Sequence, residues 1–280
     1  MRLRLCVTRQ LGILVVSLVG AGAAAGQTPA ESPPIPDCIE LARALQDVAR
    51  QDARLRDWPN LSRYRADNGA LRQAGTPVTA VFLGDSITDG WDADWAGGFF
   101  PGQGYVNRGI GGQTTPQMLV RLRPDVLEHD PKVMVLLAGT NDIAGNTGPS
   151  TDEEIQQNIA AIAELTAAHG VKVVLASVLP VSDYHRQPGQ VPQVVRRPPS
   201  RIVALNQWIA AYAARRGHVY LNYWPAVADE RGMLRKELST DDLHPNAEGY
   251  ARMAPLAEAA IRGALDRQAF LVRPPGAALE

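Results

Sequence analysis

The sequence is poor in cysteine and contains no long run of charge of one sign. Its 280 residues include two cysteines, Cys6 and Cys38, and only Cys38 lies outside the apolar N-terminal segment. One remaining cysteine cannot form an internal disulfide or a cysteine-based metal site. The net charge is −1, and Lys and Arg are not clustered, unlike in proteins that bind nucleic acid. We therefore expect no nucleic-acid partner and a fold stabilised by its hydrophobic core.

Phosphate-binding loops and long apolar runs are also missing. The glycines at 109–112 do not follow G-x-G-x-x-G, and no G-x-x-x-x-G-K-[ST] occurs, so a nucleotide carrier is disfavoured. The apolar run at 11–19 is short for a membrane span. It follows three arginines and precedes small residues at 21–25, which is typical of a signal peptide. We predict that residues 1–25 are removed on export to the periplasm or the medium, without stable membrane insertion afterwards; an uncleaved anchor is the alternative.

The rest of the chain divides into an extension, a large domain and a tail. Residues 26–75 are predicted to form a Pro-rich linker and a helical extension, residues 76–270 the main domain, and residues 271–280 a frayed tail. In the main domain, short apolar runs alternate with amphipathic helical patterns, which predicts an α/β fold with a parallel sheet covered on both faces. Strands are expected at 78–83, 105–108, 133–137, 171–178 and 219–222.

Three polar turns follow three of these strands. They are Gly84-Asp85-Ser86, Gly111-Gly112 and Gly139-Thr140-Asn141-Asp142. Right-handed crossovers place the carboxyl ends of parallel strands at one edge of the sheet, where sites are built in open α/β folds. We expect the three turns to share that edge.

Ser86 is a candidate nucleophile because it follows a buried strand at a sharp turn. A nucleophilic serine needs a base, and the base needs an orienting acid. The run Asp241-Asp242-Leu243-His244 supplies both, since within one turn the Asp241 carboxylate can reach Nδ1–H of His244. In the alternative interpretation, Asp85 and Ser86 only cap a helix, Asp241 or Asp242 caps another, and His244 is a surface residue.

Further residues are candidates for binding the substrate or its developing charge. The backbone amides of Ser86 and Gly112 and the side-chain amide of Asn141 can form an oxyanion hole, although each is also an ordinary turn residue. Trp91, in an aromatic loop, and Tyr184 and His185, in the long connection at 180–199, are candidates for substrate contact. A connection of that length is often a lid or a specificity loop.

Four motifs occur in a characteristic order: G-D-S-I-T at 84–88, N-R-G-I-G-G at 107–112, G-T-N-D at 139–142 and D-x-x-H at 241–244. In spelling and order they closely resemble the SGNH (GDSL-type) hydrolase family. The resemblance covers about residues 78–261 and points to the branch that contains platelet-activating-factor acetylhydrolase-like bacterial esterases.

The resemblance implies roles and a fold. Ser86 would be the nucleophile, His244 the base and Asp241 its orienting acid. Gly112 and Asn141 would be oxyanion donors. The fold would be a flavodoxin-like, three-layer α/β/α sandwich with a five-stranded parallel sheet, and neither a metal nor an organic cofactor would be needed. The sequence departs from the family at Gln113, where many members carry Asp; we do not expect this to abolish activity.

Our hypothesis is an exported serine esterase that hydrolyses short-chain acyl esters, acetyl esters first, with carbohydrate esters as one substrate class. The acyl group would pass through an acyl-enzyme on Ser86. The same residues would serve a lysophospholipase, a thioesterase or an arylesterase. From a different class, an inactive glycan-binding module is the remaining alternative, although such a module has no use for the complete catalytic set. The oligomeric state is left open by the sequence.

Overall fold

A computed structural model describes residues 38–266 of the chain. The predicted signal peptide, the Pro-rich linker up to residue 37 and the predicted tail at 271–280 lie outside the described residues. The chain divides into two compact units, Met1–Asp47 and Val48–Glu280. Of the first unit, the described residues are 38–47, which begin helix α1 (Cys38–Arg56). The second unit contains the sheet and all of the candidate site residues.

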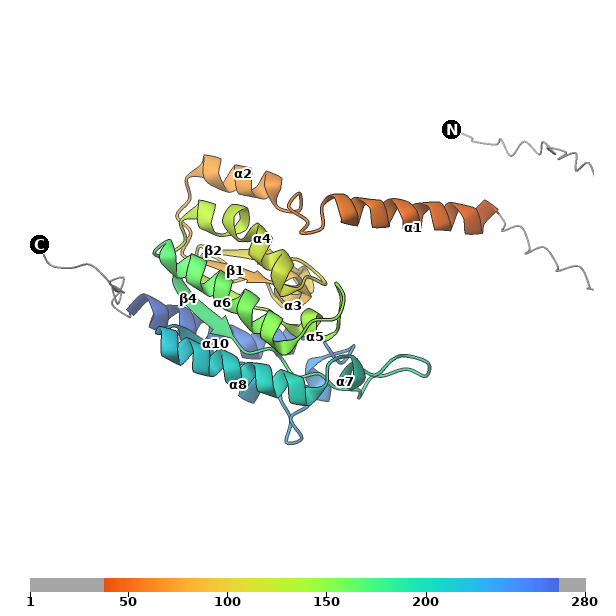
Figure 1. The fold of residues 1–280 in the computed structure, drawn as a ribbon. Helices are drawn as coiled ribbons and strands as arrows, with labels where there is room; N and C mark the ends of the chain where they lie inside the picture. The colour runs from red at the N-terminus through yellow and green to blue at the C-terminus, as the bar shows by residue number, and fades with distance from the viewer. Residues whose placement is uncertain (1–37, 267–280) are drawn as a thin grey trace, which may run out of the picture. The chain divides into compact units, whose positions relative to one another are not determined.

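The second unit is built on a five-stranded parallel sheet in the order β2-β1-β3-β4-β5. Strands β1, β2 and β4 of this sheet are labelled in Figure 1. The prediction of a five-stranded parallel sheet is therefore confirmed. The fourth strand is shorter than predicted, because its ladder ends at Ala176. The strands are β1 (Ala80–Gly84), β2 (Tyr105–Gly109), β3 (Val133–Leu137), β4 (Lys172–Ala176) and β5 (Val219–Leu221).

Helices cover both faces of the sheet. Alternate residues of a strand point to opposite faces, so Val81 and Leu83 of β1 belong to one core and Ala80 and Phe82 to the other. The first core is closed by helices α4 (Thr115–Asp125), α6 (Asp152–Ala168) and α8 (Pro199–Arg216), and the second by α10 (Ala247–Asp266) together with the short turns η1 (Gly90–Asp92) and η2 (Asp94–Ala96). The predicted three-layer α/β/α sandwich is therefore confirmed.

The remaining helices are short, apart from α2 (Arg65–Ala74) in the predicted N-terminal extension. No helix among residues 38–266 combines the length and the apolar composition that crossing a membrane requires. The short helices are α3 (Ser86–Asp89), α5 (Thr140–Ile143), α7 (Gln193–Arg196) and α9 (Trp224–Val227), with the 3₁₀ turns η3 (Leu127–His129) and η4 (Lys236–Leu238).

The three polar turns meet at the carboxyl edge of the sheet, as predicted. In register, Gly84 of β1 pairs with Gly109 of β2 on one side and with Leu137 of β3 on the other. Helices α3, α5 and α7 gather at this end of the sheet (Figure 1). The strand order also reverses here, since β2 and β3 flank β1, and such switch points carry the ligand sites of open α/β sheets.

Candidate active site

Ser86 is the first residue of α3, at the end of β1. Asp85 caps this helix, because its Oδ1 accepts a hydrogen bond of 2.9 Å from the N–H of Ile87. The turn needs glycine at position 84, where a Cβ would lie 2.0 Å from Oγ1 of Thr88. Both interpretations of G-D-S thus describe the same turn. Asp85 serves as the cap, and the Oγ of Ser86 stays available for chemistry.

The hydroxyl of Ser86 faces His244. Its Oγ lies 2.8 Å from Nε2 of His244, and Nδ1 of His244 lies 2.5 Å from Oδ2 of Asp241. With the Nδ1 proton donated to Asp241, the free lone pair on Nε2 accepts the proton of Ser86. Three residues from two distant parts of the sequence therefore form one chain of hydrogen bonds, arranged like a serine–histidine–aspartate triad.

Asp241 has a second task within its own turn. Its Oδ1 accepts hydrogen bonds from the backbone N–H groups of Leu243 (3.1 Å) and His244 (2.8 Å). Burial raises the pKa of Asp241, but the hydrogen bonds from the side chain and backbone of His244 outweigh it and lower the pKa well below the ordinary value. Asp241 is therefore ionised when it holds the imidazole. The neighbouring Asp242 instead accepts from Oγ of Ser182 (2.7 Å).

Asp85 is a buried carboxyl next to Ser86 in the chain. It is fully buried, and its Oδ2 has no hydrogen-bond partner in the described part of the chain. Burial raises the pKa of Asp85 to about 6, although the bond from the N–H of Ile87 and the nearby His244 and Arg197 act against this rise. The carboxyl of Asp85 therefore caps helix α3, although its burial disfavours the charged form.

The backbone N–H groups of Ser86 and Gly112 donate to no acceptor among residues 38–266. Gly112 has φ +79°, which favours glycine. The N–H of Gly111, in contrast, donates to Asp89 (3.2 Å). The geometry therefore agrees with Gly112, rather than Gly111, as an oxyanion donor beside Ser86.

The side-chain amide of Asn141 is held from both ends. Its Nδ2 donates to the carbonyl of Gln113 (3.0 Å), and its Oδ1 accepts from Nδ2 of Asn146 (3.0 Å) and Nη2 of Arg197 (3.2 Å). These contacts determine which end of the amide is nitrogen. Because an amide nitrogen carries two hydrogens, one remains for a developing oxyanion.

Arg197 is a site residue that the sequence did not reveal. Its side chain is buried, and its Nε donates to Oγ1 of Thr140 (3.1 Å) while Nη2 reaches Asn141. Burial, together with the neighbouring Arg196, lowers the pKa of Arg197 to about 10. No motif marks this position. The only signal was the long connection at 180–199, which brings Arg197 back to the sheet edge.

A pocket of about 790 Å³ opens beside the triad. Its walls include Ser86 and His244, the acidic side chain of Asp89, and the apolar groups of Trp95, Pro245 and Tyr250. A pocket that contains both the nucleophile and the base can hold an ester with its leaving oxygen near Nε2 of His244.

Trp91, the predicted substrate contact, is placed elsewhere. It is 4% exposed and packs on Phe100 and Tyr250 with ring centroids 5.1 Å apart, whereas Trp95 is 57% exposed and lines the Ser86 pocket. The tight 3₁₀ turns at 90–96 direct Trp91 into the core and Trp95 outward. Trp91 therefore supports the pocket through Tyr250, and Trp95 is the tryptophan that a substrate can touch.

Tyr184 and His185 do not line the Ser86 pocket either. The hydroxyl of Tyr184 donates to Asp229 (2.5 Å), and Nε2 of His185 lies 2.9 Å from the carbonyl of Lys236. These bonds hold the long connection against the neighbouring segment at 229–236. The polar groups of Tyr184 and His185, which were predicted to contact substrate, are therefore already hydrogen-bonded within the protein.

Potential metal ligands are scattered rather than grouped. Residues 38–266 contain no group of three or more His, Cys, Asp or Glu side chains placed to hold a metal ion.

Comparisons with known proteins find a family match and similar solved structures. Residues 82–252, more than half of the chain, match the model of the GDSL-like Lipase/Acylhydrolase family. The crystal structure of a GDSL-like lipase from Bacteroides thetaiotaomicron is 39% identical in sequence, covers 74% of this chain and 98% of its own, and has a TM-score of 0.65.

Two curated relatives are similar over shorter stretches. Platelet-activating factor acetylhydrolase IB subunit alpha1 of Pongo abelii is 32% identical over 176 residues, which are 61% of this chain and 70% of the relative. An uncharacterized lipoprotein of Bacillus subtilis is 34% identical over 79 residues, 27% of this chain. That match spans only 32% of the lipoprotein's length.

Proposed function

The chain belongs to the GDSL-like lipase/acylhydrolase family of carboxylic ester hydrolases, and from this premise we propose that it is an exported serine esterase for short acyl esters, acetyl esters first. The observation that carries the proposal is the continuous hydrogen-bonded chain from Asp241 through His244 to Ser86, beside an open pocket. An esterase needs this chain, whereas a binding module does not.

The proposed reaction has two halves. Oγ of Ser86 attacks the acyl carbon while its proton passes to Nε2 of His244, and the carbonyl oxygen becomes an oxyanion that accepts hydrogen bonds from the N–H groups of Ser86 and Gly112 and from Asn141. The ester C–O bond then breaks, and the alcohol leaves with the proton from His244. Water, deprotonated by His244, attacks the acyl-enzyme, and collapse of the second intermediate returns the proton to Ser86.

Two features support the preference for short acyl groups and carbohydrate esters. A relative that is 32% identical is named as an acetylhydrolase, which favours a small acyl group. The Ser86 pocket places the exposed ring of Trp95 beside the polar side chains of Asp89 and Asn246, a combination that suits an alcohol with both a C–H face and hydroxyl groups. Carbohydrate esters have such alcohols.

Export is supported by the N-terminal pattern of the sequence and by the similarity to a lipoprotein. N-terminal sequencing of the protein recovered from the periplasm or the medium tests it. A mature chain that starts near residue 26 is the expected result, and an intact N-terminus on cytoplasmic protein would refute it.

The first experiment measures hydrolysis of p-nitrophenyl esters from acetyl to long-chain acyl, with wild type beside Ser86→Ala. We expect the highest rate for acetyl and a loss of about 10⁴-fold or more in kcat for Ser86→Ala, because no other hydroxyl replaces the nucleophile. Circular dichroism controls for folding. Full turnover by purified Ser86→Ala would refute the proposal, and a rate that rises with chain length would favour a lipid esterase instead.

A further inference from the structure

A second cavity, of about 800 Å³, lies beside the Gly111-Gly112 turn. Its walls come from the segment 57–62, from residues 110–113 and from residues 144–147, with Gln117 and Arg196 at the edge. It shares no lining residue with the Ser86 pocket. It is nevertheless close to the nucleophile, since a Cβ built on Gly111 would lie 3.8 Å from Cβ of Ser86.

One wall of this cavity comes from outside the family match. The match starts at residue 82, whereas Asp57, Trp58, Asn60 and Ser62 belong to the N-terminal extension. The extension therefore adds a surface to the site that the matched domain by itself does not supply.

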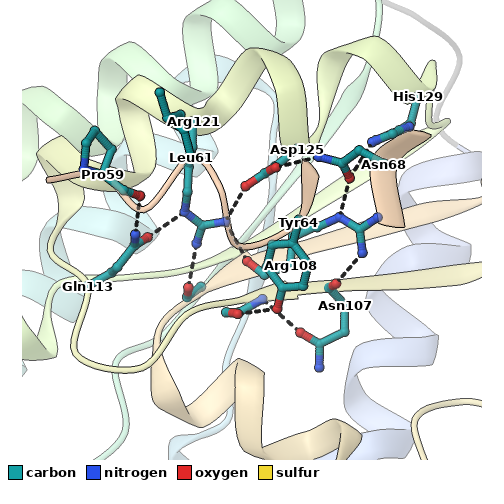
Figure 2. Close-up of polar contacts among 12 residues, drawn as sticks. Pro59, Leu61, Tyr64, Asn68, Asn107, Arg108, Gln113, Arg121, Asp125 and His129 are labelled. Carbon is teal, nitrogen blue, oxygen red and sulfur yellow. Dashed lines mark hydrogen bonds and ion pairs between the residues drawn. The ribbon is translucent and has the colours of Figure 1, made fainter. Parts of the chain in front are cut away.

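Gln113 fastens this wall to the oxyanion turn (Figure 2). Its Nε2 donates to the carbonyl of Pro59 (2.6 Å), and its Oε1 accepts from Nε of Arg121. A carboxylate at this position could accept from Arg121 but could not donate to Pro59. The amide of Gln113 thus supplies the hydrogen bond that links the extension to the oxyanion turn. Gln117 adds a similar bond from Nε2 to the carbonyl of Trp58 (2.6 Å).

A buried polar cluster stands behind Gln113 (Figure 2). We call it the Arg121 network; its members are Asn68, Arg108, Gln113, Arg121 and Asp125. Arg121 donates to the carbonyls of Gly84 (2.8 Å) and Arg108 (2.8 Å) and to the carboxylate of Asp125 (3.1 Å). The network therefore joins the ends of β1 and β2 to the residue that holds the extension.

The extension is anchored at two further points. Asn68 of α2 donates to Asp125 (2.7 Å) and accepts from Nε of Arg108 (2.9 Å). The buried hydroxyl of Tyr64 donates to the carbonyl of Gly109 (Figure 2). These contacts attach the residues just after the wall to β2 and α4, so the wall is a fixed part of the sheet edge.

The wall is also shaped internally. The carboxylate of Asp57 accepts hydrogen bonds from the N–H groups of Leu61 (2.7 Å) and Ser62 (2.9 Å), and Asn60 has φ +56°. This turn leaves Trp58 41% exposed. A preorganised wall of this kind binds without a large ordering cost.

The chemistry of the cavity suits a neutral, hydroxyl-rich ligand. Trp58 offers a ring for the C–H face of a sugar, and Asn60 and Ser62 offer uncharged donors and acceptors. The two charged side chains, Asp57 and Arg196, have opposite signs, which does not favour an anionic headgroup.

We propose that this cavity is a saccharide subsite, built by the N-terminal extension and fastened by Gln113, that holds the sugar ring next to the esterified one. The proposal rests on the esterase function proposed above. The leaving oxygen has to lie near Nε2 of His244, so the esterified ring occupies the Ser86 pocket. The neighbouring ring then extends past Gly111 into the second cavity, and the substrate is an acylated oligosaccharide rather than a monosaccharide.

Binding is tested first, without hydrolysis. Isothermal titration calorimetry on the full chain uses unesterified xylotriose, cellotriose and maltotriose. We expect at least one of them to bind, and Trp58→Ala to weaken its binding about tenfold because the stacking surface is lost. Leu165→Ala, which removes an exposed apolar side chain of α6, is the matched control and should not weaken binding.

A second variant tests the role of Gln113. Gln113→Glu keeps the acceptor for Arg121 but loses the donor to Pro59. It should weaken binding of the same trisaccharide and increase cleavage in the 57–64 segment during limited proteolysis. Gln113→Glu with unchanged affinity for the trisaccharide would overturn the assigned role of Gln113.

Kinetics then connects the cavity to the reaction. We expect kcat/KM for an acetylated trisaccharide, relative to p-nitrophenyl acetate, to fall about tenfold in Trp58→Ala, mainly through KM. A fall confined to long acyl chains on p-nitrophenyl esters would show that the cavity holds the acyl group and would overturn the proposal, as would binding of none of the three trisaccharides. If no ester is hydrolysed while Trp58-dependent trisaccharide binding persists, the esterase proposal fails and the saccharide cavity stands.

Discussion

The proposed catalytic triad and the Arg121 network each contain a carboxylate beside a basic side chain, in opposite environments. The side chains of His244 and Asp241 are 36% and 50% exposed, whereas those of Arg121 and Asp125 are 0% and 3% exposed. In the proposed reaction the triad exchanges protons with substrate and water, so it has to remain accessible. The Arg121 network takes no part in the proposed proton transfers. Arg121 donates hydrogen bonds to the carbonyls of Gly84 and Arg108, at the ends of β1 and β2. From these ends the chain turns toward Ser86 and Gly112.

This protein thus separates reactivity from support. His244 and Asp241 lie on a partly exposed turn. Arg121 and Asp125 are buried, and Arg121 is hydrogen-bonded to the carbonyls at the ends of β1 and β2. A change in the first should reduce catalysis with little loss of stability. A change in the second should reduce stability first. Four substitutions, whose expected effects decrease in turn, can test this distinction.

Asp241→Asn should have the largest effect. The asparagine can present its amide to His244 and hold the wrong tautomer, so we expect kcat to fall about 10³- to 10⁴-fold with an unchanged urea midpoint. The pKa of Asp241 is well below its ordinary value, so Asp241 stays ionised in weak acid. Asp241 therefore still holds the imidazole in weak acid, and an unchanged kcat in Asp241→Asn would contradict its orienting role.

Arg121→Met should destabilise the protein by about 3–5 kcal/mol, because it removes the buried ion-pair partner of Asp125 and one hydrogen bond to each of the carbonyls of Gly84 and Arg108. Urea unfolding measures this. The matched control is Arg201→Met, which breaks a pair with Asp152 (2.5 Å) whose side chains are 31% and 49% exposed and should cost less than about 1 kcal/mol. Equal losses in the two variants would show that the burial of Arg121 does not matter.

Asp85→Asn should change how stability depends on pH. The pKa of Asp85 is raised to about 6 from 3.8, so the folded state holds the proton more tightly than the unfolded state. Its contribution is therefore favourable in acid and lost as the pH rises from about 4 through about 6. Asparagine keeps the cap for Ile87, so relative to wild type the variant should gain up to about 3 kcal/mol between pH 4 and pH 7. If the free energies of unfolding of wild type and Asp85→Asn change with pH in the same way, the carboxylate of Asp85 is not buried as a charge in the folded protein.

Arg197→Gln should have the smallest effect, a fall of about tenfold in kcat with little change in KM, because Oδ1 of Asn141 loses one of its two hydrogen-bond donors. A positioning role predicts non-additivity, so Asn141→Ala alone and the double variant should have nearly the same kcat. Arg197→Lys should restore part of the rate. If the two losses multiply instead, Arg197 acts independently of Asn141.

Much of the fold and part of the site could be predicted from local sequence. Alternation of short apolar runs with amphipathic helices is sufficient for a covered parallel sheet. Asp241 and His244 are three residues apart, and Asp85 caps α3 through an N–H two residues on. Contacts of such short range depend on a few neighbouring residue types, which a sequence pattern records directly.

The direction of single side chains was decided by tertiary structure. Trp91 and Trp95 lie in the same aromatic loop, yet Trp91 packs into the core against Tyr250 of α10 and Trp95 lines the pocket. No local periodicity separates them, because the short 3₁₀ turns here take their direction from the helix packed against them.

The sequence by itself determined the sheet, the order of its motifs and the chemistry available at its edge. Only the tertiary structure decided what surrounds that chemistry. Arg197 reaches Asn141 across 56 residues, and Gln113 reaches Pro59 across 54. Such partners are selected when the strand order brings distant segments to one edge, where each buried polar group needs a partner. Because these partners belong to different helices, strands and loops, no periodic pattern in the sequence identifies them.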